Sequence, residues 1–350
     1  MSSIYKVLLI PFGFIYYLIT SIRNGLFYFG FKKSHSFSSP VICIGNLNVG
    51  GTGKTPHTEY FIRLLKKNYR IATLSRGYGR VTKGFIIASE KDNANTIGDE
   101  PFQLFQKFKN LIVAVDEKRV RGIKNLLKLE HRPDIIILDD AFQHRQVKAG
   151  LNILLSEYNQ AYTHDYILPI GRLREPRRGA KRADILIITK CPKTLTAIEM
   201  KSFTIDLKLT EYQKVFYSYV DYGDLIPLNE AAKSLSINYK SLKDINVCLV
   251  SAIANPKPLE EFILKYNSQP DIINFPDHYY FREKDYELFN TKFTNLTKQK
   301  VLLLTEKDAT KLNFEKLEKI PVFAVPIEIK FHSLANTNID EEIINYVKSY

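Results

Sequence analysis

The segment "VICIGNLNVGGTGKTPHTEY" constrains the fold of this chain more than any other, and it covers residues 41–60. It starts with an apolar run, continues with a glycine-rich loop and ends in a segment with helical periodicity. Glycines in such a loop let backbone N–H groups face phosphate oxygens at the positive end of the following helix. The order of strand, glycine-rich loop and helix therefore predicts a nucleotide phosphate site in an α/β fold.

The loop differs in two places from the common pattern G-x-x-x-x-G-K-S/T. Asn48 stands where the pattern has glycine, and Pro56 follows the threonine without an N–H that is often directed at the α-phosphate. Proline still fits the first turn of a helix. We expect Lys54 to reach the β- and γ-phosphates and the Thr55 hydroxyl to hold Mg²⁺. The predicted nucleotide-binding residues are Asn48, Val49, Gly50, Gly51, Thr52, Gly53, Lys54 and Thr55.

Short apolar strands alternate with helical segments after this loop. Continuous apolar runs are typical of parallel strands covered on both faces. The alternation predicts a doubly wound, mostly parallel sheet of the P-loop NTPase type. Residues 203–222 alternate apolar and polar side chains, which predicts an antiparallel β pair. We expect a core domain over 34–202, a two-stranded hinge over 203–222 and a smaller C-terminal α/β domain over 223–350.

Acidic residues occur in two motifs that suit phosphoryl transfer. In "DIIILDDAFQH", Asp139 and Asp140 end a strand, where a doubly wound sheet places its ligand and where carboxylates coordinate Mg²⁺. In "TIGDEP", Asp99 precedes a helix and is a candidate general base for an acceptor hydroxyl. The alternative in both motifs is that the acids only cap helices.

The segment "LPIGRLREPRRGAKR" over residues 168–182 is a basic loop between two predicted core strands. Arginine guanidinium groups clamp phosphate, although a solvated charge run is the simpler alternative. The chain of 350 residues has a formal net charge of +13, which indicates an anionic partner.

The N-terminal 33 residues form a separate apolar segment. Between Lys6 and Arg23 lie 16 residues without a charge, interrupted by Pro11 and Gly13, and aromatic side chains are frequent throughout. A spanning helix needs about 20 apolar residues. We therefore interpret residues 1–33 as a segment that lies in the membrane interface, with a buried helix pair as the alternative.

The motifs together resemble the tetraacyldisaccharide 4′-kinase family, which phosphorylates the lipid A precursor. The strings that carry the resemblance occur in the family's order between residues 40 and 312: "GNLNVGGTGKTP", "SRGYG", "GDEP", "DDAFQH", "LPIGRLREP", "TKC", "PDHYYF" and "TEKDATKL".

The resemblance implies ATP as cosubstrate, Mg²⁺ as metal, and γ-phosphate transfer to the 4′-hydroxyl of a tetraacyldisaccharide 1-phosphate. It implies an enzyme of lipopolysaccharide synthesis on the cytoplasmic face of a Gram-negative inner membrane. It assigns Asp99 as catalytic base paired with His278, and the metal to Thr55, Asp139 and Asp140. The residues implied to face the lipid acceptor are Arg76, Tyr78, Arg172, Arg174 and Glu175.

Two other classes of protein remain open from the residues alone. A nucleotide-hydrolysing switch or metallochaperone would share the loop, but guanine recognition wants N/T-K-x-D, and "TKCP" has Pro192 in place of the aspartate. A nucleic-acid-dependent ATPase would explain the charge, but the cations gather in one loop and at the N-terminus instead of following a groove. We expect no nucleic acid and no obligate protein partner. Cys43, Cys191 and Cys248 have neither disulfide nor zinc spacing.

Overall fold

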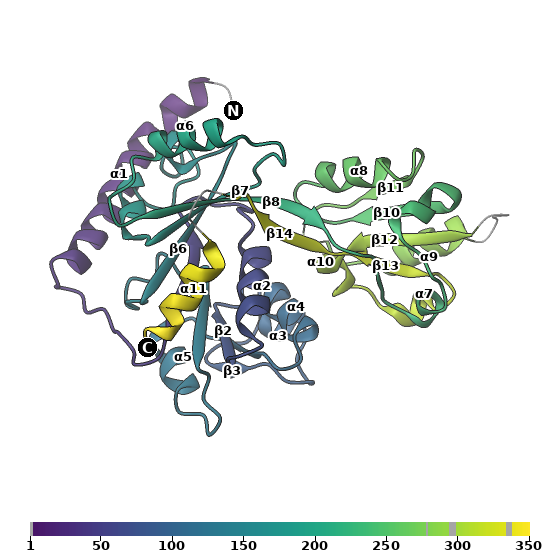
Figure 1. Cartoon of the computed structure of the whole chain (residues 1–350), viewed down its shortest axis with the longest axis horizontal. Helices are drawn as coiled ribbons and strands as arrows, with labels where there is room; N and C mark the ends of the chain where they lie inside the picture. Colours follow the sequence, from purple (N-terminus) through teal and green to yellow (C-terminus); the bar gives the residue numbers. More distant parts are fainter. Residues whose placement is uncertain (1–2, 278, 294–298, 334–337) are drawn as a thin grey trace. The chain divides into compact units, whose positions relative to one another are not determined.

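The computed structural model describes residues 3–277, 279–293, 299–333 and 338–350. The chain forms two compact units (Figure 1). Unit 1 comprises Met1–Val220 and Ile329–Tyr350, and unit 2 comprises Asp221–Glu328.

Unit 1 is built on a nine-stranded sheet with the strand order β14-β8-β7-β6-β1-β5-β2-β4-β3. All the strand pairs from β8 to β4 are parallel, and the short β3 pairs antiparallel with β4. The predicted doubly wound, mostly parallel sheet is therefore confirmed. The strands are β1 (Val41–Asn46), β2 (Ile71–Ser75), β3 (Ile86–Ile87), β4 (Ile112–Val115), β5 (Ile135–Asp139), β6 (Leu151–Glu157), β7 (Ile185–Thr189), β8 (Lys214–Tyr222) and β14 (Ile327–Phe331).

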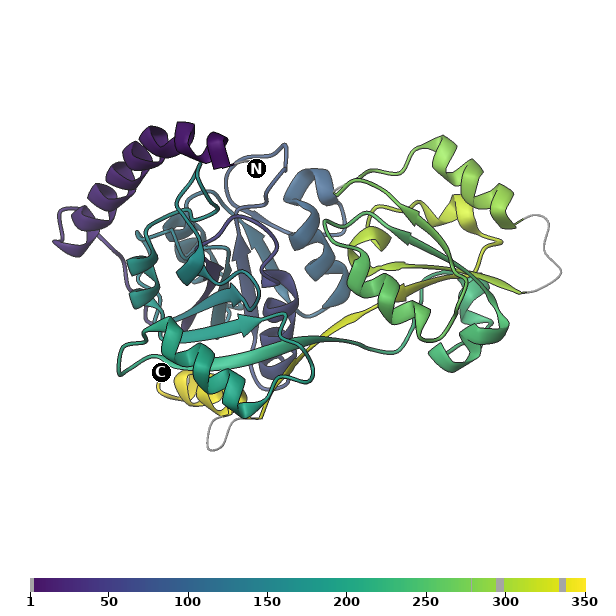
Figure 2. The ribbon, with the colours of Figure 1, turned by 90° about the horizontal axis from the view of Figure 1, so that it is seen from above.

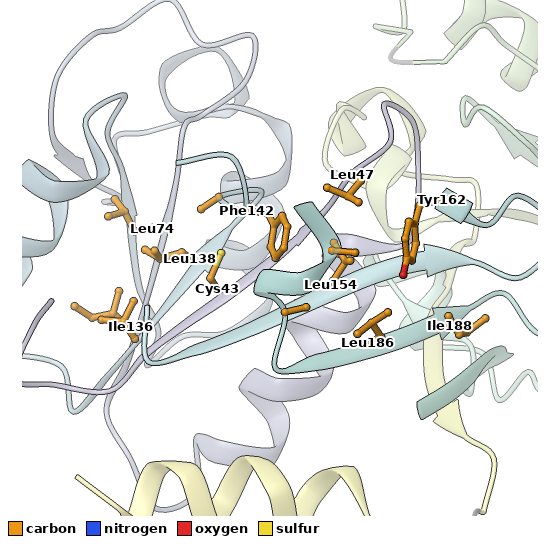
Figure 3. Close-up of a cluster of buried hydrophobic side chains, with 14 of the residues drawn as sticks. Cys43, Leu47, Leu74, Ile136, Leu138, Phe142, Leu154, Tyr162, Leu186 and Ile188 are labelled. Atoms are coloured by element: carbon orange, nitrogen blue, oxygen red, sulfur yellow. The ribbon is translucent and has the colours of Figure 1, made fainter. Parts of the chain in front are cut away.

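The central strand β1 is buried on both faces, as its continuous apolar sequence predicts. Val41 and Cys43 belong to one hydrophobic cluster, which Figure 3 shows, whereas Ile42 and Ile44 belong to another. Successive side chains of a strand point to opposite faces, so the two clusters are the two covers of the sheet. Burial raises the pKa of the Cys43 thiol to about 12, and all three cysteines are free and buried.

Helices cover this sheet. They are α2 (Lys54–Leu65), α3 (Ala94–Ile97), α4 (Asp99–Lys107), α5 (Arg119–Leu126), α6 (Ala197–Leu207) and α11 (Ile339–Lys348), with 3₁₀ turns η1 (Tyr162–His164) and η2 (Arg177–Arg182). The C-terminal helix α11 buries Ile339, Ile343 and Val347 in the cluster of Ile42. Residues 329–350 therefore belong to unit 1, and the predicted extent of the C-terminal domain, 223–350, is too long.

The prediction of an antiparallel pair over 203–222 is wrong. Residues up to Leu207 complete α6, which starts with a capping box of Thr196 and Glu199, and only β8 is a strand. Phe203 and Leu207 fit one face of a strand as well as one face of a helix, whereas the capping box before them favours the helix. The sheet neighbour of β8 is β14, which follows unit 2 in sequence, so no local pattern could reveal the pair.

Unit 2 contains a five-stranded sheet with the order β11-β10-β12-β13-β9, in which only β9 is antiparallel. Its strands are β9 (Ile226–Pro227), β10 (Asn246–Ser251), β11 (Asp271–Asn274), β12 (Lys300–Thr305) and β13 (Val322–Val325). Its helices are α7 (Glu230–Lys233), α8 (Lys257–Leu264), α9 (Glu283–Phe293) and α10 (Glu306–Ala309), with 3₁₀ turns η3 (Tyr239–Asp244) and η4 (Phe314–Leu317). A second, smaller α/β unit is thus confirmed.

The N-terminal segment is one continuous helix, α1 (Ser3–Tyr28), on the outside of unit 1 (Figure 2). The expected interruption at Pro11 and Gly13 does not occur. A Cβ at Gly13 would lie 2.4 Å from Cδ1 of Ile170, so this glycine permits a close approach instead of breaking the helix. The stretch Val7–Tyr28 has 22 residues and a mean hydropathy of 1.4, which is long and apolar enough to cross a membrane by length and composition.

Candidate functional site

The glycine-rich loop joins β1 to α2 and is held from both sides. Gly53, with φ of 85°, precedes Lys54 in a left-handed conformation that favours glycine. The Asn46 side chain donates to the Thr52 hydroxyl at 2.9 Å, and the Thr189 hydroxyl donates to the Thr52 carbonyl at 3.0 Å. The ends of β1 and β7 therefore fix the loop, and Lys54 and Thr55 are the first two residues of α2.

Two carboxylates converge on the start of α2. The Thr55 hydroxyl donates to Oε1 of Glu100 at 3.1 Å, and the Thr58 hydroxyl donates to Oδ1 of Asp139 at 3.4 Å. Asp139 is 3% exposed. Burial, and then the nearby carboxylates of Glu100 and Asp140, raise the pKa of Asp139 to about 7. Burial and the two neighbouring carboxylates therefore disfavour the ionised form of Asp139.

The neighbouring Asp140 has a different environment. Its φ of 47° ends strand β5, so its side chain does not continue the alternation. The Arg174 guanidinium donates to both of its carboxylate oxygens at 3.0 Å, and Nζ of Lys54 lies 3.8 Å from Oδ1. Asp140 therefore connects the phosphate loop with the arginine loop.

These donors fit a magnesium ion. Mg²⁺ prefers oxygen ligands and usually keeps waters and phosphate oxygens besides one or two carboxylates. Thr55 and Glu100, which are partly exposed, and the buried Asp139 supply a hydroxyl and two carboxylates. Within the described residues, His, Cys, Asp and Glu side chains form no cage of three, so phosphate and water would complete the coordination.

The segment "SRGYG" packs against the start of α4. A Cβ at Gly98 would lie 2.9 Å from the Tyr78 carbonyl, and one at Gly77 would lie 2.6 Å from the Ile97 carbonyl. This close approach packs the turn at Gly77 and Tyr78 against Gly98, the residue before Asp99, with which α4 begins.

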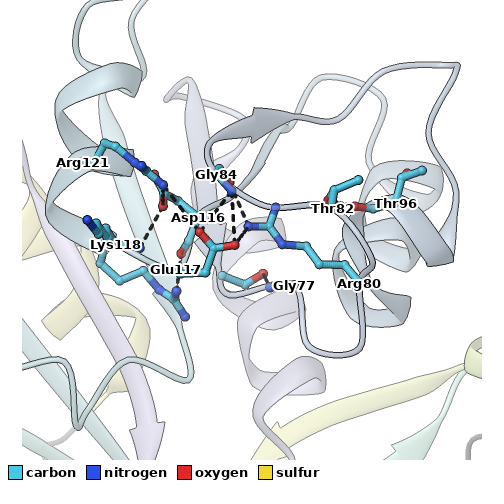
Figure 4. A network of polar contacts seen from close by, with 11 residues as sticks. Gly77, Arg80, Thr82, Gly84, Thr96, Asp116, Glu117, Lys118 and Arg121 are labelled. Carbon is cyan, nitrogen blue, oxygen red and sulfur yellow. Dashed lines mark hydrogen bonds and ion pairs between the residues drawn. The ribbon is translucent and has the colours of Figure 1, made fainter.

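A polar network holds the outer end of this turn (Figure 4). Arg80 pairs with Glu117, which also accepts from the Gly84 N–H at 3.1 Å, and Arg121 donates to Asp116 at 2.7 and 2.9 Å. Tyr78 extends from this fixed turn and is 84% exposed, as a contact to a bound partner requires.

The arginine loop touches the phosphate loop directly. The Arg174 N–H donates to the Leu47 carbonyl, and the Val49 N–H donates to the Arg172 carbonyl, both at 2.7 Å. Asp165 accepts from the Asn48 side chain at 2.7 Å and from Nε of Arg172 at 2.9 Å. Asn48 is therefore a bridging residue, which explains why glycine is absent at that position.

The Glu175 carboxylate is surrounded by protein donors. Its side chain is 4% exposed. Asn24 and Arg182 each donate to it at 2.8 Å, and Gln143 donates at 3.1 Å. Glu175 therefore joins α1 to the arginine loop, and its contact with the acceptor stays a prediction.

Sequence reasoning missed two residues of the site. Glu100 stands beside Asp99 in "GDEP", and the periodicity of α4, which turns the two side chains by about 100° from each other, was the available signal. Asp165 has no motif around it that marks it. The predicted catalytic His278 lies outside the described residues.

Comparisons with known proteins agree over nearly the whole chain. Residues 5–345 match the family model of tetraacyldisaccharide-1-P 4′-kinase. The chain is 44% identical to the tetraacyldisaccharide 4′-kinase of Parabacteroides distasonis, which covers 98% of this chain and 97% of that protein. It is 47% identical to the Flavobacterium psychrophilum enzyme of the same name, over 97% and 96% of the two chains.

A solved structure agrees as well. The apo-form LpxK of Aquifex aeolicus in complex with ATP superposes with a TM-score of 0.74 at 31% identity and covers 99% of both chains. Matches of this extent in sequence and structure leave one assignment: the chain belongs to the tetraacyldisaccharide-1-P 4′-kinase family.

Proposed function

We propose that this protein transfers the γ-phosphate of ATP to the 4′-hydroxyl of a tetraacyldisaccharide 1-phosphate in lipid A synthesis. Membership of the family supports the reaction and the acceptor class. The observation that carries the proposal is the contact of Thr55 with Glu100 beside buried Asp139, at the first turn after the phosphate loop.

The phosphate loop and the arginine loop both supply positive charge that neutralises the phosphate groups of ATP. Lys54 and the N–H groups at the start of α2 neutralise the β- and γ-phosphates, and Arg174 stands across Asp140 from Lys54. Mg²⁺, held by Thr55, Asp139 and Glu100, would supply further neutralisation of the phosphate oxygens. We assign Asp140 to positioning Lys54 and Arg174, because both already pair with it.

Asp99 takes the proton of the attacking hydroxyl in this proposal. It is the first residue of α4, and its neighbour Glu100 faces Thr55, so the turn carries both the base and a metal ligand. Arg76 and Tyr78 contact the acceptor sugar from the adjacent turn. The partnership of Asp99 with His278 stays a prediction from the family resemblance.

Helix α1 attaches the protein to the membrane. The face of α1 that touches unit 1 is small or polar: Gly13 contacts Ile170, the Tyr16 hydroxyl donates to the Arg174 carbonyl at 3.0 Å, and Asn24 donates to Glu175. The face away from the unit carries apolar side chains that are 53–64% exposed, namely Val7, Leu8, Ile10, Phe12, Phe14, Ile15, Ile19 and Ile22.

A surface helix of a water-soluble protein buries its apolar face and exposes its polar face, and α1 does the opposite. Contacts from Gly13 to Asn24 keep about 16 Å of helix against the unit, which favours a helix that lies along the bilayer over one that spans it. Because ATP is the cosubstrate, we place the protein on the cytoplasmic face of the inner membrane.

The reaction is tested with purified protein in detergent, γ-labelled ATP and the lipid acceptor. We expect label in the lipid at the 4′ position, whereas ATP hydrolysis without lipid phosphorylation would contradict the proposal. Asp99→Asn should lower kcat much more than it raises KM for ATP. Glu90→Gln, at an exposed position of the same unit, is the matched control.

Membrane attachment is tested by flotation with vesicles. Phe12→Asp with Ile19→Asp should move the protein from the lipid fraction to the soluble fraction without loss of folded structure by circular dichroism. Flotation equal to that of the unchanged protein would exclude α1 as the anchor.

A further inference from the structure

Helices α2 and α4 meet along a row of polar side chains. Residues three or four positions apart lie on the same face of a helix, and each of these helices turns one polar stripe toward the other. The α4 stripe is Glu100, Gln103 and Lys107, and the α2 stripe is Thr55, Glu59 and Arg63. Together these residues are the α2–α4 seam.

The inner end of the seam lies at the phosphate-transfer site. The Thr55 hydroxyl donates to Oε1 of Glu100 at 3.1 Å. Thr55 is the second residue of α2 and Glu100 is the second residue of α4, so this contact joins the first turns of the two helices. One hydrogen bond fixes one point of α4, but it does not fix the direction in which the helix runs.

Glu59 supplies a second point, one turn further along α2. It is 3% exposed. Its carboxylate accepts from Nε2 of Gln103 at 3.1 Å and from Nζ of Lys107 at 2.6 Å, both on α4. Arg63, one turn later on α2, donates to it at 3.0 Å. A buried carboxylate requires donors that replace its lost water, and α4 provides two of these three.

The last turn of α4 is held as well. Phe108 directly follows α4 and is 6% exposed. Its ring centre lies 5.7 Å from Cζ of Arg63 and 5.2 Å from Nζ of Lys66, which caps α2. Both distances suit a cation–π contact. The contacts between the two helices therefore extend over about 16 Å of α2, which fixes both the rotation of α4 and its position along α2.

The placement of α4 matters because Asp99 is its first residue. A general base must lie within hydrogen-bond reach of the proton it takes. The backbone before Asp99 provides little restraint, since Gly98 has φ of 96° and ψ of 154°, where glycine is conformationally free. Leu104 packs in the cluster of Ile42, but apolar packing is not directional. The directional contacts of α4 with α2 come from the seam.

We propose that Glu59 is a positioning residue for phosphoryl transfer. By accepting from Gln103 and Lys107 it sets the rotation of α4 and its position along α2. It thereby places Asp99 and Glu100 at the phosphate loop. The inference rests on the proposed function, because it concerns the base of that reaction. A contact that served folding alone would change the amount of folded protein and leave the turnover of each folded molecule unchanged.

The experiment measures transfer of label from γ-labelled ATP to the lipid acceptor in detergent at saturating Mg²⁺. Lys107→Met removes the cation on α4 and keeps the length of the side chain. Glu59 then retains Arg63 and Gln103 as donors, so the variant should fold. Because a displacement of about 1 Å costs about 100-fold in rate, we expect kcat to fall by about tenfold to 100-fold. KM for ATP should change by less than about twofold, since Lys54 and the loop are untouched.

Two matched variants and a double-mutant cycle accompany this measurement. Lys107→Arg, which keeps the charge, should retain most of the turnover. Lys109→Met, the same change at an exposed position two residues further on, should behave as the unchanged protein. Glu59→Gln should also lower kcat, and adding Lys107→Met to it should lower kcat little further, because both changes break one contact.

Hydrogen exchange gives a readout that does not depend on turnover. The α4 amides should exchange faster in Lys107→Met than in the unchanged protein, whereas the α2 amides should not change. Unchanged exchange of α4 would overturn the proposal. Unchanged kcat in Lys107→Met, a rise in KM for ATP as large as the fall in kcat, or multiplied effects in the double variant would do the same. Failure of the unchanged protein to label the lipid would instead refute the proposed function, and the exchange comparison would still test the seam.

Discussion

Helices α2 and α1 both belong to unit 1, but they use their apolar residues in opposite ways. α2 buries Phe61, Ile62 and Leu65 at 0–1% exposure in the core of the sheet. α1 turns Gly13 and Thr20 inward and leaves Phe12 63% exposed. An apolar helix face can therefore pack against protein or against lipid, and the neighbouring elements show which. The apolar face of α2 packs against protein, and we propose that the apolar face of α1 contacts lipid.

The two helices should differ most in how the loss of one phenylalanine side chain changes the free energy of unfolding. Phe61→Ala should lower the free energy of unfolding by about 3 to 5 kcal/mol, because it leaves a cavity in the core. Phe12→Ala should change it by less than about 0.5 kcal/mol. Urea unfolding in detergent measures both, and similar losses would show that α1 is a core helix.

A functional difference should follow from the position of α2 beside the metal site. Asp139→Asn should reduce phosphoryl transfer by about 10³-fold, which corresponds to about 4 kcal/mol of transition-state stabilisation. The raised pKa of Asp139 means that its charge destabilises the ligand-free fold as pH rises from about 4 to about 7. The variant should therefore be inactive in the labelled-ATP assay yet at least as stable at pH 7.5, and Asp206→Asn at an exposed position should change neither property.

The buried His57 of α2 should make the free energy of unfolding depend on pH. Nδ1 of His57 donates to the Gly53 carbonyl at 2.7 Å, and Nε2 accepts from the Ser218 hydroxyl at 2.9 Å. Burial lowers the pKa of His57 to about 4. The unfolded chain takes up a proton near pH 6.5 before the folded chain does, so stability is complete above that pH and is lost as pH falls toward about 4. The loss should reach about 3 kcal/mol.

His57→Gln tests this expectation, since it removes the titrating group and keeps a polar side chain. Its unfolding free energy, measured by urea at pH 7.5 and at pH 4.5, should fall less than that of the unchanged protein. The same pH dependence in both proteins would assign the acid sensitivity to other groups.

The smallest effect concerns the packing of α1 on unit 1. Gly13→Ala should destabilise this contact by about 1 kcal/mol, because its Cβ would meet Ile170 at 2.4 Å. Gly25→Ala, at a position with nothing within 4 Å, should instead stabilise the helix by up to about 1 kcal/mol. Hydrogen exchange of the α1 amides should therefore change in opposite directions, and a shared direction would contradict the docking of α1 through Gly13.

Much of the site could be predicted because its residues lie within short ordered motifs. Lys54 and Thr55 open α2, and Asp139 and Asp140 end β5, since a buried strand followed by a polar turn leaves few alternatives. Glu100 could not be predicted because adjacent side chains of a helix point in different directions. Only the contact of Glu100 with Thr55 shows that Glu100 faces the phosphate loop. The burial of Glu175 could not be predicted, because two of its three donors, Asn24 and Gln143, come from segments distant in sequence.

Sequence alone was sufficient to infer the parallel sheet, the phosphate loop and the family, because these depend on local periodicity and on residues close together in the chain. Three-dimensional contacts were needed to establish that β8 pairs with β14, that α11 belongs to unit 1, that Asp165 bridges Asn48 and Arg172, and that the apolar face of α1 points outward. Each of these depends on segments far apart in sequence, whose contacts are set by complementary shape and by the satisfaction of buried polar groups. No single stretch of sequence contains both halves of such a contact.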